Sequence, residues 1–86
     1  MVLKIDVFTS VFCRHSPGAV NLMKRLAPDF KGSLEWNEIS IETREGKEKA
    51  RTIGVDSVPT IVIDGKIVFI GTPQKSDLVS EITKRL

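Results

Sequence analysis

The sequence predicts an α/β domain in which a four-stranded mixed sheet is flanked by three helices, in the order βαβαββα. Short β-branched and aromatic runs alternate with segments that carry apolar residues at helical spacing. An Asp64-Gly65 pair separates the last two β-type runs, as in a tight hairpin. A length of 86 residues allows one modest core, so residues 1–86 are predicted to form a single domain.

The first strand is predicted over residues 3–8, where apolar residues alternate with period two. The odd-numbered apolar residues then share one face and Phe8 lies on the other. Apolar contacts on both faces are typical of a central strand. A second strand is predicted over residues 34–41, and its irregular apolar phase favours a position at the edge of the sheet.

Two helices are expected to connect the first three strands. The first begins at Ser16-Pro17, since proline suits the first helical turn and serine can cap it. It ends or kinks before the next proline, which disfavours helical geometry at the residue in front of it. The second helix spans residues 43–53 and is charged, and Glu45 and Lys49 are spaced for an ion pair along it.

The last third of the chain predicts a hairpin followed by a helix. Residues 61–63 and 66–70 are rich in β-branched side chains and are joined by Asp64-Gly65, which favours a type I′ turn. Both runs are almost entirely apolar, so both strands are expected to be buried on two sides. The C-terminal helix is predicted from the spacing of its apolar residues, which are Leu78, Val79, Ile82 and Leu86.

The composition excludes several classes of function. No segment is long and apolar enough to cross a membrane, and Lys4 and Asp6 interrupt the stretch where a signal peptide needs apolar residues. We therefore expect a cytoplasmic protein, and a monomer. The net charge of +2 is spread along the chain, so no nucleic-acid partner is expected. One cysteine and one histidine are too few for a structural zinc site within one chain, and no bound metal is expected.

The only cysteine, Cys13, lies where the first strand turns into the first helix. Unpaired backbone N–H groups and the positive end of the helix dipole favour the thiolate there, and the thiolate is the nucleophile. Arg14 and His15 add positive charge if their side chains face the sulfur, although His15 could equally be a solvated turn residue. Phe12 is expected to shield one side of the sulfur. Without nearby cations and a helix start, a lone cysteine is more often a small buried residue than a catalytic one. Cys13 and Ser16 together form the motif C-x-x-S.

With the Cys13 turn, a Val58-Pro59-Thr60 segment and the hairpin in this order, the chain resembles the thioredoxin superfamily, and most of all its short glutaredoxin-like or thioredoxin-like members from archaea and bacteria. The resemblance covers essentially the whole chain and implies a thioredoxin fold. It also implies a cis Val58-Pro59 peptide bond beside the thiol, where an extended substrate can pair with the Val58 backbone as an added strand. Its most specific part is the pattern Ala50-x-x-x-Gly54-Val55-x-x-Val58-Pro59-Thr60-x-Val62-x-x-Gly65.

Two departures from the family pattern affect the expected chemistry. Members with two active-site cysteines use the second to release the mixed disulfide, and Ser16 stands at that place here. Thioredoxins proper carry a buried aspartate where this chain has Val7, so the resemblance leans toward glutaredoxins. Gly71 and Thr72 fall where glutaredoxins contact glutathione through a glycine-rich segment. The substrate-binding residues that the resemblance implies are Val58, Pro59, Gly71 and Thr72.

We therefore expect a monothiol thiol-disulfide oxidoreductase. The Cys13 thiolate attacks a disulfide and forms a mixed disulfide, which an external low-molecular-weight thiol resolves. The expected partners are disulfide-containing proteins and a reductase or small thiol, with no resident cofactor. Three alternatives stay open. Cys13 could hold an iron-sulfur cluster between two protomers, as C-G-F-S monothiol glutaredoxins do; the chain could be a non-catalytic adaptor for extended peptides; or Ser16 could be an engineered replacement of a resolving cysteine.

Overall fold

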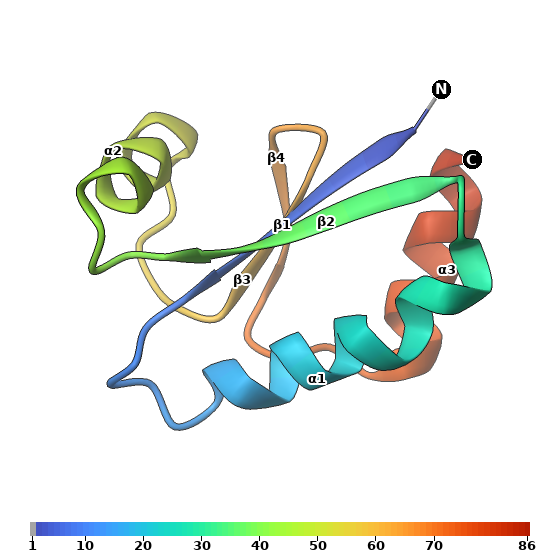
Figure 1. The fold of residues 1–86 in the computed structure, drawn as a ribbon, viewed down its shortest axis with the longest axis horizontal. Helices are drawn as coiled ribbons and strands as arrows, with labels where there is room; N and C mark the ends of the chain where they lie inside the picture. The colour runs from blue at the N-terminus through green and yellow to red at the C-terminus, as the bar shows by residue number, and fades with distance from the viewer. Residues whose placement is uncertain (1) are drawn as a thin grey trace.

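In the computed structural model, which describes residues 2–86, four strands form one mixed sheet in the order β2-β1-β3-β4 (Figure 1). β1 pairs in parallel with β2 and antiparallel with β3, and β3 pairs antiparallel with β4. The predicted architecture is confirmed, with β1 inside the sheet and β2 at an edge. The strands are β1 (Leu3–Thr9), β2 (Leu34–Ser40), β3 (Thr60–Ile63) and β4 (Lys66–Ile70).

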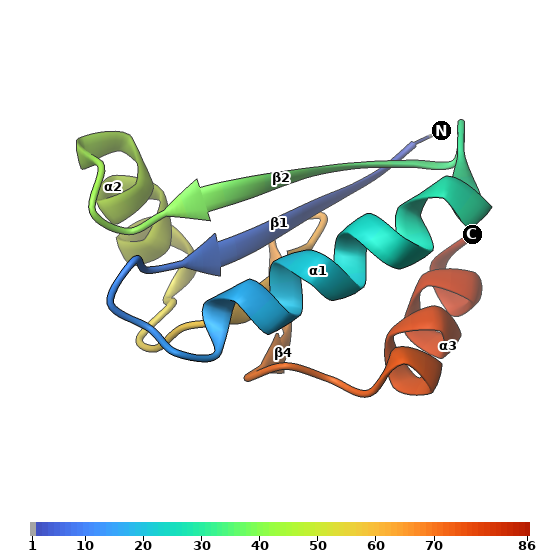
Figure 2. The ribbon, with the colours of Figure 1, turned by 60° about the horizontal axis from the view of Figure 1, so that its bottom comes forward.

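Three α-helices cover the two faces of this sheet. α1 and α3 pack on one face and α2 packs on the other (Figure 2). α1 ends just before Pro28, as expected, and a short 3₁₀ segment, η1 (Ala27–Phe30), follows it. Within residues 2–86, no helix has both the length and the hydrophobicity needed to cross a bilayer. The α-helices are α1 (Ser16–Leu26), α2 (Arg44–Ile53) and α3 (Lys75–Arg85).

The alternation of side chains along β1 divides the apolar interior in two. Ile5 and Val7 belong to the core beneath α1 and α3, whereas Phe8 belongs to the core beneath α2, and all three are fully buried. The two-sided burial predicted for the first strand is therefore confirmed. The larger core contains Leu3, Ile5, Val7, Ala19, Val20, Leu22, Met23, Leu26, Ile61, Ile63, Leu78 and Ile82, and the smaller one contains Phe8, Ala50 and Val62.

The hairpin forms at the predicted turn, but only one of its strands is buried. Asp64 and Gly65 have φ angles of 50° and 81°, as a type I′ turn requires. Every residue of β3 is buried, whereas β4 is the second edge of the sheet and Ile70 is 72% exposed. Two-sided burial is therefore wrong for β4. An apolar run alone does not distinguish a central strand from an edge strand that the helices leave uncovered.

The ion pair predicted within α2 is also wrong. Lys49 Nζ lies 3.0 Å from Asp6 Oδ2 on β1 instead of pairing with Glu45. The Asp6 side chain is only 15% exposed, so its carboxylate is poorly hydrated and gains more from a cation than the exposed Glu45 does. The pair fastens α2 to the sheet.

The first turn of α2 packs directly against the end of β2. Thr43 caps the helix, because its Oγ1 accepts the Gly46 N–H at 2.9 Å and donates to the Ser40 carbonyl at 3.0 Å. A Cβ built on Gly46 would overlap the Ser40 carbonyl oxygen and lie 2.8 Å from Thr43 Oγ1. Glycine at this position therefore allows the helix to approach the strand.

Replacing Gly46 with alanine is expected to destabilise the protein, whereas the same change at Gly18 in α1 is expected to stabilise it. Both positions are helical, so alanine gains about 0.5–1 kcal/mol of helix propensity at each. At Gly18 the added Cβ meets only the Thr72 side chain, at 3.7 Å. At Gly46 we expect the backbone overlap to outweigh that gain, with a net loss of about 1–3 kcal/mol. Urea unfolding measures both, and equal stabilisation would contradict the close packing of α2.

Candidate active site

Cys13 lies in the loop that joins the carboxyl end of β1 to α1, and it is partly exposed. Its backbone N–H donates to the Ser10 carbonyl at 3.1 Å, which closes a tight turn just before the helix. His15 is the residue that precedes α1 and makes no side-chain cap, and Pro17 lies in the first helical turn. The N–H groups at the start of α1 are thus left for another acceptor, and the sulfur lies beside them.

The surroundings of Cys13 lower the pKa of its thiol below the ordinary value. The largest cause is a hydrogen bond from the Ser16 side chain; burial acts in the opposite direction, and the backbone N–H groups of His15 and Ser16 add to the lowering. Each donor favours the thiolate, since a hydrogen bond to a charged form stabilises it. The structure therefore brings together the sulfur, the Ser16 position and the start of the helix.

Ser16 does not act as the helix cap that the sequence favoured. It is the first residue of α1 itself and is only 3% exposed. Its Oγ accepts the Ser10 N–H at 3.2 Å, which leaves its proton for the sulfur. The chain enters the helix one residue earlier than expected, so the hydroxyl points back into the loop rather than onto the first turn.

The side chains of Phe12, Arg14 and His15, the residues around Cys13 in the loop, are all exposed. Phe12 is 87% exposed and extends into solvent, so the expectation that it shields the sulfur is wrong. Arg14 and His15 are also exposed, and it is the His15 backbone that contributes to the lowered pKa of Cys13. Stabilisation of the thiolate by the side chains of Arg14 and His15 stays a prediction.

Val58 and Pro59 lie next to the sulfur although they are far away in the chain. Cys13 Sγ donates to the Val58 carbonyl oxygen at 3.4 Å, across 45 residues of sequence. The Val58-Pro59 peptide bond is cis, as the resemblance implies, and Pro59 is buried. The thiol and the Val58 backbone are therefore placed so that one bound chain can reach both.

Gly71 and Thr72 also lie near the Cys13 turn, but their polar groups have partners within the chain. The Gly71 N–H donates to the Pro59 carbonyl at 2.7 Å, and Thr72 Oγ1 donates to the His15 carbonyl at 3.3 Å. The two residues thus connect the Pro59 segment with the start of α1. Their contact with a substrate stays a prediction.

A cluster of polar side chains beside the loop was missed by the sequence reasoning. Glu42, which follows β2, accepts the Ser10 hydroxyl at 2.7 Å, the Val11 N–H at 2.9 Å and the Ser40 hydroxyl at 3.1 Å. Ser10 Oγ in turn accepts the Phe12 N–H at 3.1 Å. One signal could have found the cluster, because polar residues that follow two adjacent parallel strands meet at the same edge of the sheet.

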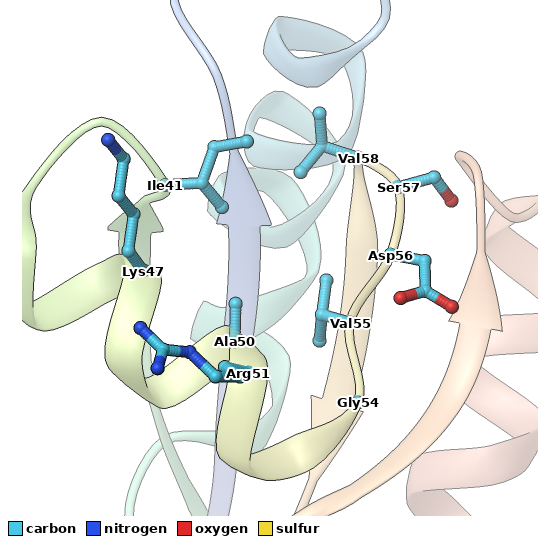
Figure 3. Close-up of a pocket in the computed structure, with 9 residues that line it drawn as sticks. All are labelled: Ile41, Lys47, Ala50, Arg51, Gly54, Val55, Asp56, Ser57 and Val58. Carbon is cyan, nitrogen blue, oxygen red and sulfur yellow. The ribbon is translucent and has the colours of Figure 1, made fainter.

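A pocket of about 430 Å³ opens on the other side of Val58, between α2 and residues 54–58 (Figure 3). Its apolar lining includes Ile41 and Val55, and Lys47 and Arg51 bring positive charge from α2. Val58 connects the pocket with the site, because it lines the pocket and its carbonyl oxygen accepts a hydrogen bond from Cys13 Sγ.

No group of three or more His, Cys, Asp or Glu side chains in residues 2–86 is placed to hold a metal ion. Cys13 is the only cysteine of the chain. An iron-sulfur cluster at this site would therefore require ligands from outside the chain.

Comparison with known proteins places this geometry in a family. A family model described as a thioredoxin domain matches residues 3–84. The protein named "Thioredoxin" from Methanocaldococcus jannaschii is 40% identical over 84 residues, which cover 98% of this chain and 96% of that protein. Proteins named "Probable Thioredoxin" from Methanothermobacter marburgensis and Methanothermobacter thermautotrophicus are 33% and 31% identical over 86 residues, covering 100% of this chain and 99% of each relative. With its sheet order, its thiol at the start of α1 and its cis proline beside the sulfur, the chain belongs to the thioredoxin family.

Proposed function

We propose that the protein is a monothiol disulfide oxidoreductase in which Cys13 is the nucleophile. The observation that carries the proposal is the position of a partly exposed sulfur among donors that lower its pKa, the Ser16 hydroxyl first among them. A larger thiolate fraction at neutral pH makes the sulfur a more available nucleophile. Membership of the thioredoxin family supports the same class of reaction.

The reaction runs in two exchanges. The Cys13 thiolate attacks one sulfur of a protein disulfide, the S–S bond of the substrate breaks, and the second substrate sulfur leaves as a thiolate. The chain has no other cysteine to attack the resulting mixed disulfide. An external thiolate, from a low-molecular-weight thiol or a reductase, attacks the substrate sulfur of the mixed disulfide and releases Cys13 as a thiolate. The donors that favour the nucleophile also favour this leaving group.

Ionisation of Cys13 and binding of an extended substrate favour each other at Val58. The thiol donates to the Val58 carbonyl at 3.4 Å, and a thiolate has no proton to donate. Once the sulfur is ionised, the carbonyl is free to accept an N–H from a substrate backbone laid alongside it. An extended substrate is therefore bound best when Cys13 is ionised, which is the form that attacks the disulfide.

We further propose that the residues flanking the attacked cysteine of the substrate occupy the pocket beside Val58 (Figure 3). Its apolar lining suits an aliphatic side chain, and Lys47 and Arg51 favour an acidic group beside it. Asp56 lines the same pocket, so the local charge is positive by a single unit rather than two.

Replacing Ser16 with alanine is expected to raise the pKa of the Cys13 thiol, because the Ser16 hydroxyl is the largest cause of its lowering. At any pH below the thiol pKa the thiolate fraction then falls, so the curve of alkylation rate against pH moves to higher pH. Iodoacetamide labelling across a pH series measures it. Ser80→Ala, on the exposed side of α3, is the matched control and should leave the curve in place. An unmoved curve in Ser16→Ala would contradict the assigned hydrogen bond.

Replacing Ser16 with cysteine is expected to change which partner resolves the mixed disulfide. Reduced Ser16→Cys protein, mixed with a disulfide peptide without small thiol, should release both peptide thiols and end with an internal disulfide between Cys13 and the introduced cysteine. The parent chain should stop as a mixed disulfide until a small thiol is added. Mass spectrometry of the quenched reaction distinguishes the two products.

Turnover of both proteins with small thiol present supports the monothiol enzyme proposed here. Turnover of Ser16→Cys alone, under the same conditions, would contradict it and favour Ser16 as the replacement of a resolving cysteine.

Reversing the charges at the pocket, with Lys47→Glu and Arg51→Glu together, is expected to reduce kcat/KM for an acidic disulfide peptide by about three- to tenfold, as for two exposed charge contacts. A neutral peptide of the same length should lose less, because it makes no charge contact with the pocket. The control pair Lys31→Glu and Lys66→Glu changes the net charge equally, at exposed positions near the opposite ends of the strands. Equal losses in the two double variants would show a general charge effect and rule out the pocket as the determinant.

A further inference from the structure

One carboxylate holds the loop that carries the reactive sulfur. Glu42 accepts three hydrogen bonds, and two of them come from that loop, from the Ser10 hydroxyl at 2.7 Å and the Val11 N–H at 2.9 Å. The same contacts lower the pKa of Glu42, the Val11 N–H most of all, so the carboxylate is ionised at neutral pH. Lys47 on α2 adds to the lowering. The end of β2 is thereby tied to the loop after β1.

Ser10 connects Glu42 with the residues around the sulfur through two further hydrogen bonds. Its carbonyl accepts the Cys13 N–H at 3.1 Å, and its own N–H donates to Ser16 Oγ at 3.2 Å. Ser10 and Ser16 are both buried, at 9% and 3% exposed, so water competes little for these groups. The hydrogen bond from Ser10 places the Ser16 oxygen, and the Ser16 hydroxyl is the largest cause of the lowered pKa of Cys13.

We propose that Glu42 is a positioning residue for the reactive thiol, acting through Ser10 to hold the Ser16 hydroxyl in the orientation that donates to Cys13. A role of Glu42 in catalysis rests on the proposed function, whereas an effect of Glu42 on the ionisation of the Cys13 thiol does not. The hydrogen bonds of Glu42 go to Ser10, Val11 and Ser40 and not to the sulfur. Its hydrogen bonds to Ser10 and Val11 attach the loop after β1 to the chain that follows β2.

The sign of the effect separates positioning from simple electrostatics. A negative charge near a thiol disfavours the thiolate, so removal of the Glu42 charge alone would lower the pKa of Cys13. Loss of the hydrogen bonds that orient Ser16 would raise it instead. The two explanations therefore predict shifts in opposite directions for the same variant.

The test compares the thiol pKa of four proteins, measured from the pH dependence of thiolate absorbance: the parent chain, Glu42→Gln, Ser16→Ala and the double variant. Glu42→Gln keeps the size of the side chain and one acceptor, so it favours a folded protein, which circular dichroism checks. We expect Glu42→Gln to raise the pKa and to reduce alkylation at neutral pH by about threefold. In the Ser16→Ala background the same change should raise it no further, since the hydroxyl to be oriented is already gone. Glu35→Gln removes one charge from an exposed position on β2, the strand that precedes Glu42, and should leave the pKa unchanged.

A lowered or unchanged pKa in Glu42→Gln overturns the proposal, as does an equal rise in the Ser16→Ala background. A loss of stability without a change of pKa also overturns it, because Glu42 would then be structural only. The proposed function fails separately, if the parent chain does not reduce disulfides when a small thiol is present. The pKa shifts can be measured in either case, so the two failures are distinguishable.

Discussion

The parallel pairing of β1 with β2 is the constraint on which the site depends. The register places Thr9 opposite Ser40, and the Ile41 N–H extends the ladder to the Thr9 carbonyl at 2.9 Å. Both strands therefore end at the same edge, so the loop after β1 and the turn after β2 meet there. A slip of one residue between the two strands would move Glu42 away from Ser10 and would also move the side chains of β2 to the opposite faces of the sheet. Leu34 and Trp36 pack against one core and Ile39 against the other, so the apolar side chains of β2 and the polar contacts of the loop specify the same register.

At the sulfur, hydrogen bonding prevails over the cost of desolvation. Burial acts to raise the pKa of Cys13, and the combined donors of Ser16 and the His15 backbone lower it by more. The surrounding polar groups are satisfied, since no buried side-chain nitrogen or oxygen atom in residues 2–86 lacks a hydrogen-bond partner. Buried polar side chains that are already paired can hold donors in place before a substrate arrives, so little reorganisation is needed when the sulfur takes up negative charge.

The features that the sequence predicted correctly are those that local chemistry determines. Pro28 marks the end of α1 and Asp64-Gly65 marks the hairpin, because each restricts the backbone at its own position. The position of Cys13 between a strand and a helix could be read for the same reason. What failed depended on neighbours distant in sequence. β4 has an uncovered face because of where the helices pack, and Lys49 pairs with Asp6 on β1 rather than within α2. Glu42 was missed because its partners lie far away in the chain, 32 residues from it for Ser10 and 31 for Val11.

Val7 and Ser16, the two departures from the family pattern, are physically consistent with each other. Val7 stands where thioredoxins carry a buried carboxylate for proton transfer, and here it is fully buried in the core beneath α1. Glu42, the carboxylate that holds the loop, is occupied by three hydrogen bonds and contacts the loop rather than the sulfur. No carboxylate in residues 2–86 is buried, and hydrogen-bond donors are what lower the pKa of Cys13. A serine at position 16 cannot attack a mixed disulfide on Cys13 as a cysteine would, but its hydroxyl favours the Cys13 thiolate, as a valine at position 7 could not.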